Sequence, residues 1–488
     1  MSDVVKGLTP QPLWDFFAKI SDIPRPSKKE QKIRAFILSV SRELALETDQ
    51  DKTGNIVVRK PATNGKEKSP SVALQCHLDM VCEKNSDIEH DFERDGIQLE
   101  RSNGYIRAKG TTLGSDNGIG VAAALAVMAD RTTVHGPMEF LFTIDEETGL
   151  TGAHGLQRDF LKSKILLNLD SEEDGALYVG CAGGRDTLLT LTVKREKIPS
   201  EGVGFLLEMK GLSGGHSGID IDSGRGNAIK LLARILHAIG SKTRIFSIDG
   251  GSLRNAIPRE ARVSIWVRKE DAGWVEGQVS MWNLTFRNEF GAVEPSLNAA
   301  VSPLNKTETE ALTINDQKKI IDLLVALPHG VMRMSPDIPG LVETSTNVAT
   351  IKTEREAITV GTNQRSSVRS ALDEVMARVA IIGALVDARI ETTDGYPGWK
   401  PNLNSTALAV TKKSHVTLFG AEPEVKAIHA GLECGIIGEK YPGIDMVSFG
   451  PTILGAHSPT ERVEIRTVER FWKLLTLVLN EFAEKQEN

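Results

Sequence analysis

The chain has 488 residues, of which 40% are hydrophobic and 25% charged, a composition typical of globular proteins. Lys and Arg number 58 against 65 Asp and Glu, a formal net charge of −7 at pH 7. This acidic balance, with only 5% aromatic residues, argues against a nucleic-acid-binding protein, which typically has a basic face or a stacking platform. No apolar stretch approaches the ~18 residues of a membrane-spanning helix, so we expect no membrane partner.

The cysteines and the N-terminal segment both favour a cytoplasmic protein. The chain has four cysteines, too few for a disulfide framework at this length, and Cys76 and Cys82 match no zinc-finger spacing. Residues 1–30 contain no apolar run followed by small residues, so we expect no secretory signal. At about 150 residues per domain, the length is compatible with two large domains.

The first part of the chain alternates predicted helices and strands. Helices are predicted over residues 11–19, 29–47 and 117–130, and short apolar strands over 71–76, 138–144 and 164–169. The helix over 117–130 is small and apolar on all sides, which indicates a buried helix. This alternation predicts a mostly parallel sheet covered by helices.

After about residue 185 the pattern becomes that of an α+β domain. Two strands, 187–194 and 204–210, are predicted to form an antiparallel pair. Further elements are predicted for a helix over 227–240 with Gly240 as its C-cap, a strand over 261–268, a helix over 316–327, a strand over 356–362 and a helix over 370–388.

The first pattern returns after the turn-rich segment 394–401. The predicted elements are a strand over 424–428, a short helix over 431–438, a strand over 445–449 and a helix over 466–481. We therefore predict an α/β protein with a discontinuous domain, residues 1–186 and 400–488, interrupted by an inserted α+β domain, residues 187–399. Residues 185–186 and 394–401 are candidate hinges between the two domains.

Histidine and acidic side chains follow four of the predicted strands. They are His77, Asp79, Asp145, Glu146, Glu147, Asp170 and, in a glycine-containing loop, His457. Parallel α/β sheets bind ligands beyond the carboxyl ends of their strands. Carboxylates gathered there would raise one another's pKa, and a divalent cation is the simplest way to keep them ionised. One such acid alone could equally be a helix cap.

Three of these positions suggest particular roles. His77 and Asp79 lie two residues apart, so in a strand both face one side, and the carboxylate can hold the imidazole's second N–H. Asp116, at the glycine-flanked start of the small-residue helix, is either an N-cap or a metal bridge. The glycines around it do not form G-x-G-x-x-G, which disfavours nucleotide binding. The adjacent Glu146 and Glu147 cannot face the same way: if Glu147 faces a metal, Glu146 can act as a general base, although an acidic surface turn is the simpler alternative.

The chain carries these residues in motifs that resemble the M20 family of co-catalytic zinc metallopeptidases, in its aminoacyl-histidine dipeptidase branch. The motifs follow the family's order: CHLDMV (76–81), TTLGSDNGIGVA (111–122), DEETGLTGA (145–153), NLDSE (168–172), GLSGGHSG (211–218), RNAIP (254–258) and GAHSP (455–459). They extend over nearly the whole chain. The resemblance implies that residues 1–186 and 400–488 form the catalytic domain, and that residues 187–399 form a lid domain that closes over the substrate.

The resemblance implies two metal ions and assigns their ligands. His77 and Asp170 would bind one zinc, Glu147 and His457 the second, and Asp116 would bridge the two. Asp79 would orient His77, and Glu146 would be the general base and later the proton donor to the leaving amine. Mn²⁺ or Co²⁺ can occupy the same ligands.

The resemblance also implies groups that bind the substrate. His216 would stabilise the tetrahedral oxyanion, and Asn255 would contact the substrate. Arg365 would bind the substrate's carboxylate, with Arg369 as the alternative, and a surface salt bridge is the plainer explanation for either. From its position alone we predict that Glu433 recognises the free amine.

The predicted function is metal-dependent hydrolysis of dipeptides with free termini, including Xaa-His substrates such as β-alanyl-histidine. A tripeptide aminopeptidase and an N-acyl amino acid hydrolase on the same scaffold are the alternatives, because pockets are poorly read from one sequence. A non-catalytic binding protein is disfavoured, since every expected ligand is present. Small-lid members of the family dimerise through the lid, so a homodimer stays open here, as does whether His216 acts within its own subunit.

Overall fold

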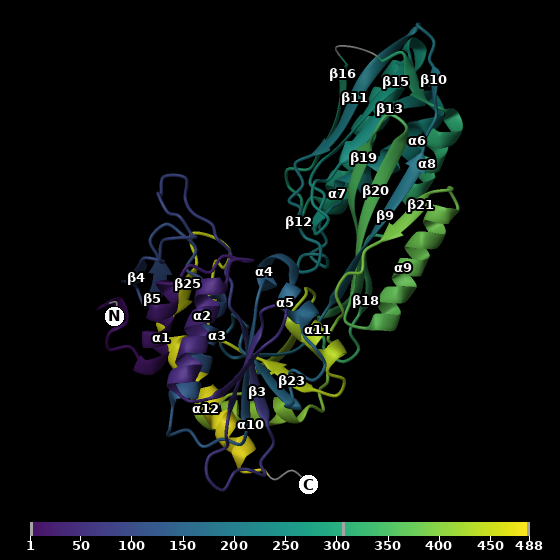
Figure 1. Ribbon diagram of the computed structural model, residues 1–488. Coiled ribbons are helices and arrows are strands. Elements are labelled where there is room, and N and C mark those ends of the chain that lie inside the picture. The colour runs from purple at the N-terminus through teal and green to yellow at the C-terminus, as the bar shows by residue number, and fades with distance from the viewer. Residues whose placement is uncertain (1–2, 305–307, 486–488) are drawn as a thin grey trace. The chain divides into compact units, whose positions relative to one another are not determined.

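The computed structural model describes residues 3–304 and 308–485, which form two compact units. Unit 1 comprises 1–180, 401–427 and 432–488, and unit 2 comprises 181–400 and 428–431. The described N-terminal and C-terminal segments, purple and yellow in Figure 1, both belong to unit 1. The assignment changes from unit 1 to unit 2 at Cys181 and back at Pro401, and residues 428–431 of the C-terminal segment group with unit 2.

Unit 1 is built around an eight-stranded sheet that is parallel at its centre. Its order is β1 (Glu47–Gln50), β2 (Ile56–Lys60), β6 (Met138–Thr143), β3 (Val72–His77), β7 (Ile165–Asn168), β23 (Asp445–Ser448), β8 (Ala176–Cys181) and β22 (Glu424–Ile428). The pairs β6–β3, β3–β7 and β7–β23 are parallel. Strands β3, β6 and β7 are buried along their whole length, as expected for strands covered on both faces.

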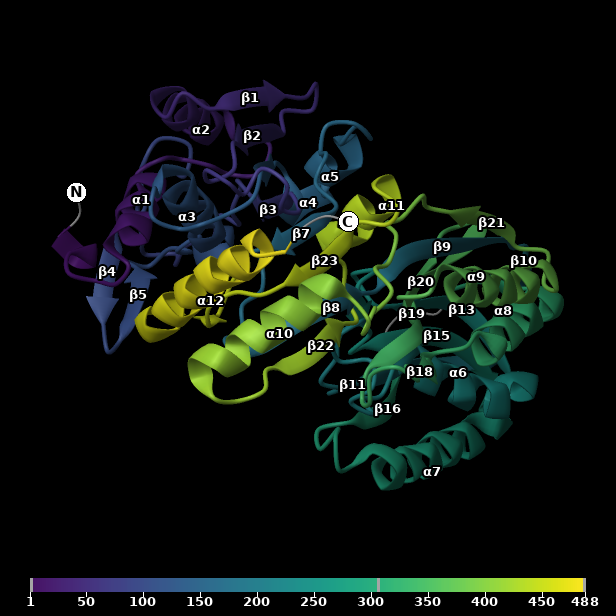
Figure 2. The ribbon, with the colours of Figure 1, turned by 90° about the horizontal axis from the view of Figure 1, so that it is seen from below.

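Helices cover this sheet. They are α1 (Gln11–Ser21), α2 (Gln31–Glu43), α3 (Ser115–Ala129), α4 (Glu146–Gly149), α5 (Thr151–Gly155), α10 (Thr406–Phe419), α11 (Glu433–Lys440) and α12 (Ile465–Ala483). Helix α3 packs against β3 and α1, which explains why its small apolar residues are buried on every side. Helix α10 packs against β7 and β23 and lies beside α12, as Figure 2 shows. A small sheet of β24 (Ile453–Leu454), β25 (Arg462–Glu464), β5 (Tyr105–Ala108) and β4 (Leu99–Ser102) completes the unit, with the 3-10 turn Asp3–Val5.

Unit 2 contains a nine-stranded antiparallel sheet. Its order is β16 (Asn298–Pro303), β11 (Gly202–Lys210), β15 (Ala261–Arg268), β13 (Thr243–Gly250), β19 (Val342–Thr353), β20 (Ala357–Ser366), β9 (Gly183–Thr192) and β21 (Arg389–Thr392), with β18 (Gly330–Met334) paired to β19. Short pairs are formed by β10 (Arg195–Lys197) with β17 (Glu310–Leu312) and by β12 (Gly215–His216) with β14 (Ala256–Ile257).

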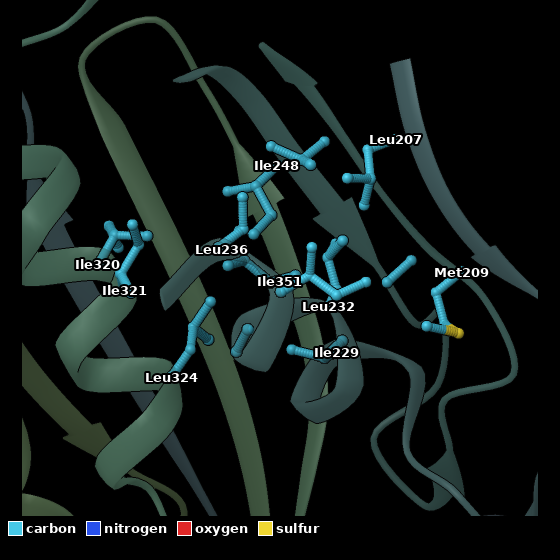
Figure 3. Packing of buried hydrophobic residues seen from close by; sticks show 14 of the residues in the cluster. Leu207, Met209, Ile229, Leu232, Leu236, Ile248, Ile320, Ile321, Leu324 and Ile351 are labelled. Carbon is cyan, nitrogen blue, oxygen red and sulfur yellow. The ribbon is translucent and has the colours of Figure 1, made fainter. Parts of the chain in front are cut away.

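Four long helices pack with the sheet of unit 2. They are α6 (Ala228–Ile239), α7 (Ala272–Phe290), α8 (Ile314–Ala326) and α9 (Arg369–Ala384). The apolar face of α6 meets α8 and the strands β11, β13 and β19, so that Leu232, Leu236 and Ile320 share one core with Ile248 and Ile351 (Figure 3). The side chain of Asn227 caps α6, and Gly240 follows as the predicted C-cap.

One predicted strand pairing in unit 2 was wrong, and one helix in each unit was not predicted. Strands β9 and β11 are not paired with each other: β9 pairs with β20 and β21, and β11 with β15 and β16. Alternation of apolar residues specifies which face of a strand is buried, but not its partner. Helices α7 and α10 were not predicted. Helix α7 buries only Val275, Val279 and Phe286 and contains two glycines, which weakens the helical pattern.

Candidate active site

The functional residues predicted in unit 1 lie at the carboxyl ends of its parallel strands. His77 is the last residue of β3, and Asp170 follows β7 by two residues. Glu146 and Glu147 begin α4, three residues after the end of β6. Because β6, β3 and β7 are parallel neighbours, their carboxyl ends lie on one edge of the sheet. His457 comes from the loop that follows β24, where its φ is +61°.

Asp116 lies between the two histidines. Its Oδ1 is 3.0 Å from Nε2 of His77, and its Oδ2 is 3.1 Å from Nε2 of His457. Asp170 Oδ1 is 3.2 Å from His77 Nε2, and Glu147 Oε2 is 3.0 Å from His457 Nε2. Two groups of potential ligands, His77–Asp116–Asp170 and Asp116–Glu147–His457, each have their donor atoms within 4.8 Å of one another and share Asp116. This is the arrangement that two ions bridged by one carboxylate require.

The charges at this cluster fit a divalent cation. Burial lowers the pKa of His77, but Asp170 and Asp116 outweigh it and raise that pKa well above its ordinary value. Hydrogen bonds to Asp116 and Glu147 raise the pKa of His457 to about 11. The raised pKa values reflect the excess of negative charge around the two imidazoles, which a bound cation would offset. Among the described residues, Glu147 Oε1 is buried without a hydrogen-bond partner. Imidazole and carboxylate donors suit zinc, and also manganese or cobalt.

Asp79 connects the end of β3 to the acidic turn that follows β6. Its side chain is fully buried, with Oδ1 3.4 Å from His77 Nδ1. The backbone N–H groups of Glu146 and Glu147 donate to its two oxygens at 3.0 and 3.2 Å, and Ser27 Oγ donates at 2.8 Å. Burial would raise the pKa of Asp79, but its bonds to His77 and the backbone lower it. Asp79 therefore fixes both the imidazole and the position of Glu146.

Glu146 has the environment of a general base. One of its oxygens lies within 4.8 Å of donor atoms of both His77 and Glu147. Burial raises the pKa of Glu146 well above its ordinary value; the charge of His77 opposes this shift, and the neighbouring carboxylates add to it. A carboxyl group with a raised pKa can accept a proton near neutral pH and later return it.

His216 in unit 2 is held as a neutral N–H donor. Its Nδ1 accepts the backbone N–H groups of Gly218 at 3.2 Å and Ile219 at 3.1 Å, so the ring proton is on Nε2. Burial and the charge of Arg365 lower the pKa of His216 to about 4. Asn255 is exposed, and its carbonyl accepts the N–H of Ser217 at 2.8 Å, next to His216.

The structure distinguishes the two candidate arginines of unit 2. Arg365 on β20 is 4% exposed, its Nε donates to Asn363 Oδ1 and its Nη1 donates to Tyr396 Oη, both at 2.9 Å. Arg369 starts α9 with its side chain 55% exposed, and pairs with Asp373 one turn along the helix. Arg365 is therefore an oriented, buried cation, whereas Arg369 has the environment of a surface residue.

The structure places Glu433 away from solvent. It is the first residue of α11, is completely buried, and its Oε2 accepts hydrogen bonds from Gln75 Nε2 and Thr143 Oγ1, both at 2.6 Å. Gln75 continues the buried network to Asn168. A carboxylate enclosed in this way beneath the strand ends has no exposed surface for an ammonium group, so the geometry does not favour recognition of the substrate amine by Glu433.

The buried Glu433 predicts a pH dependence of stability. Burial raises its pKa from 4.5 to about 7, so the folded protein keeps a proton that the unfolded chain has already lost. The free energy of unfolding therefore falls as pH rises between those values, by about 2–3 kcal/mol between pH 5 and pH 8. We expect this component to be missing in Glu433→Gln. Urea unfolding of metal-free protein at both pH values measures it, and equal pH dependence in the two proteins would contradict the prediction.

Sequence reasoning missed two buried charged residues next to the cluster, Arg25 and Glu461. Arg25 Nη1 donates to the carbonyls of Leu78 at 3.1 Å and Asp79 at 2.8 Å, and its Nη2 donates to the carbonyl of Gly114. Their partners are distant in the sequence, so no local pattern identifies them. The one available signal was that Glu461 lies four residues after His457 in the same loop.

Comparison with known proteins identifies the family. Residues 73–481 match the family model described as Peptidase family M20/M25/M40. The chain belongs to this family. The predicted family and fold class are thereby confirmed, and this member of the M20 family is a peptidase, a hydrolase of peptide bonds.

Individual relatives of this M20 peptidase cover its full length. It is 44% identical over 480 residues to the cytosol non-specific dipeptidase of Escherichia coli, covering 98% of this chain and 99% of that protein. The crystal structure of aminoacylhistidine dipeptidase from Vibrio alginolyticus superposes with a TM-score of 0.93 at 44% identity, covering 100% and 99% of the two chains. An aminopeptidase from Bacillus cereus, at 17% identity over 98% and 100% of the chains and a TM-score of 0.58, shares the fold. Across the described residues, we find no helix with the length and apolar character to span a membrane.

Proposed function

We propose that this M20 peptidase is a metal-dependent dipeptidase that hydrolyses dipeptides with free termini, including Xaa-His substrates such as β-alanyl-histidine. The observation that carries the proposal is the pair of ligand groups that share Asp116, with Glu146 beside them. The names of the Escherichia coli and Vibrio alginolyticus proteins, each 44% identical to this chain, support the substrate class. The first of these names also supports a cytoplasmic location.

The proposed cofactor is two divalent ions, with zinc as the expected metal. His77, Asp170 and Asp116 would hold one ion, and Asp116, Glu147 and His457 the other. Such ions supply Lewis-acid chemistry: they polarise a carbonyl and lower the pKa of water. The support for this assignment is the donor set, the shared carboxylate and the unpartnered oxygen of Glu147.

The residues of the chain would divide the remaining work. Glu146 takes a proton from the attacking water and gives it to the leaving amine, so one group serves both halves of the reaction. Asp79 keeps His77 and the backbone of Glu146 in place. His216 donates Nε2–H to the oxygen that becomes negative in the transition state. Arg365 binds the substrate's carboxylate, which a guanidinium can grip with two hydrogen bonds, and Asn255 contacts the substrate.

A hydrolysis panel on chelator-stripped protein tests the proposal. The substrates are β-alanyl-histidine, two ordinary dipeptides, a tripeptide and an N-acetyl amino acid, each with and without added Zn²⁺ or Mn²⁺. We expect metal removal to abolish activity and metal addition to restore cleavage of the dipeptides alone. Cleavage of the tripeptide or the acylated substrate instead would keep the metal chemistry and overturn the substrate class. No activity with either metal would overturn the proposed metal-dependent dipeptidase activity.

A further inference from the structure

Glu461 binds the backbone that leads into α3 and carries Asp116. Its Oε2 accepts the N–H groups of Leu113 at 2.8 Å and Gly114 at 2.9 Å. Its Oε1 accepts the N–H and the hydroxyl of Ser115 at 2.7 and 2.6 Å, and the N–H of Asp116 at 3.3 Å. The residue is 2% exposed. One buried carboxylate therefore takes five hydrogen bonds from four consecutive residues.

This contact satisfies a need that the local sequence leaves open. Asp116 and Asn117 have non-helical φ and ψ angles, so the segment from Leu113 to Asp116 precedes the regular turns of α3, and its backbone N–H groups need acceptors from elsewhere. Gly114 has no side chain that could accept them, and Glu461 supplies the acceptor from more than 340 residues along the chain. A carboxylate that accepts N–H groups makes charge-assisted hydrogen bonds, about twice as strong as neutral ones.

Glu461 also belongs to the loop that carries His457. The two residues are four apart, and the N–H of Glu461 donates to the carbonyl of Ser458 at 3.0 Å, which closes a tight turn between them. The same carboxylate thus joins the loop of His457 to the backbone of Asp116. Asp116 and His457 are two of the three ligands in one of the two candidate metal groups.

Arg25 holds the Asp116 segment from its other side. Through Gly114 it connects this segment to the carbonyls of Leu78 and Asp79, just after His77. Burial lowers the pKa of Arg25, whereas the negative charges of Glu461 and Asp79 raise it. The segment therefore has two buried charged anchors, Arg25 toward His77 and Glu461 toward His457.

We propose that Glu461 is a positioning residue that couples Asp116 to His457 and thereby sets the affinity for the ion held by Asp116, Glu147 and His457. The inference rests on the proposed metal centre. The ion held by His77, Asp116 and Asp170 keeps the anchor at Arg25 and depends less on Glu461. Replacement of such an outer residue typically weakens metal binding by about 10–100-fold.

The test compares Glu461→Gln with the native protein and with the control Glu464→Gln. Glutamine has nearly the same size as Glu461 but places an NH₂ group where one of the carboxylate oxygens accepts hydrogen bonds. The hydrogen bonds to that oxygen are therefore lost. Glu464 lies in the same segment, outside both metal groups, and the control makes the same change in charge. Chelator-stripped proteins are titrated with Zn²⁺ against a chromophoric chelator, and the bound zinc is counted by atomic absorption.

We expect two zinc ions per chain in the native protein and in Glu464→Gln. For Glu461→Gln we expect the first binding constant to stay near native and the second to be weakened by about 10–100-fold. Two native binding constants in Glu461→Gln, or equal weakening of both, would overturn the inference. Absence of zinc binding by the native protein would instead overturn the proposed metal centre, so the two failures are distinguishable.

A milder variant covers the case in which Glu461→Gln does not fold, as judged by circular dichroism. Ser115→Ala removes one hydroxyl donor to Glu461 and leaves all charges and all backbone donors in place. A smaller weakening of the second zinc ion alone supports the inference. Unchanged binding of both ions to a folded Ser115→Ala overturns it.

Discussion

Glu146→Gln is expected to lower kcat for β-alanyl-histidine by about 10²–10⁴-fold, with little change in KM or in bound zinc. The amide has almost the same size as the carboxyl group but cannot accept a proton from water at neutral pH. The backbone of residue 146 would remain bound to Asp79, because that hydrogen bond uses its N–H group. Steady-state kinetics with a zinc determination on the same sample measures both quantities.

The control for this variant is Glu173→Gln. Glu173 is a half-exposed acid that pairs with Lys426 and lies outside the candidate metal groups, so its kinetics should stay near native. A Glu146→Gln protein with native kcat would exclude Glu146 as the base. A protein that has lost zinc as well as activity would show that Glu146 acts in metal binding, which also contradicts the role proposed for it.

Arg365→Ala is expected to lower kcat/KM for dipeptides with a free carboxylate through a rise in KM. Loss of one partner of a buried, hydrogen-bonded charge pair costs about 2–5 kcal/mol, which corresponds to roughly 30-fold to several thousand-fold. The same variant should act on dipeptide amides about as well as the native protein does, because their C-terminus carries no charge. The ratio of kcat/KM for acid and amide substrates is therefore the deciding measurement.

Two further variants separate recognition of the carboxylate from general disturbance of unit 2. Arg369→Ala removes the same side chain four residues away, from an exposed position paired with Asp373, and should leave the ratio unchanged. Tyr396→Phe removes only the hydroxyl that accepts from Arg365 Nη1, and should reduce the ratio partially. If Arg369→Ala lowers the ratio and Arg365→Ala does not, the assignment of the two arginines is reversed.

The family motifs and the edge at which the acids gather could be predicted from the sequence. Each of the residues concerned lies within three residues of the end of a short apolar run, and the end of such a run can be read directly from the sequence. In a parallel sheet the carboxyl ends lie together whatever the exact order of the strands. That is why His77, Asp170, Glu146 and Glu147 were expected to converge before any distance was known.

Pairing between distant strands was beyond the reach of the same reasoning. The strands β9 and β11 are adjacent among the long strands of unit 2 and were expected to pair, yet each has other partners. A β-hairpin pairs two strands that are neighbours in the sequence, so its pairing could have been predicted from the local sequence. The observed partners of β9, β20 and β21, lie far along the chain, and helix α9 packs on all three strands.

The position of Glu433 also depended on tertiary structure. A residue at the start of a helix after a strand can face either the crevice or the core. In the fold, Gln75 and Thr143 meet its carboxylate from neighbouring strands and enclose it. Sequence spacing contains no information about these two partners, because Gln75 lies 358 and Thr143 290 residues away from Glu433.

The sequence by itself determined the family, the fold class and the residue types available for metal chemistry. Periodicity, motifs and the order of motifs along the chain can all be read without knowing which distant segments come into contact. Only the tertiary structure decided that Arg365 rather than Arg369 is buried and oriented, that Glu433 faces inward, and that Glu461 holds the backbone of Asp116. The physical reason is common to all three. A charged group takes its role from the donors and acceptors that packing brings to it, and here most of those partners are distant in sequence.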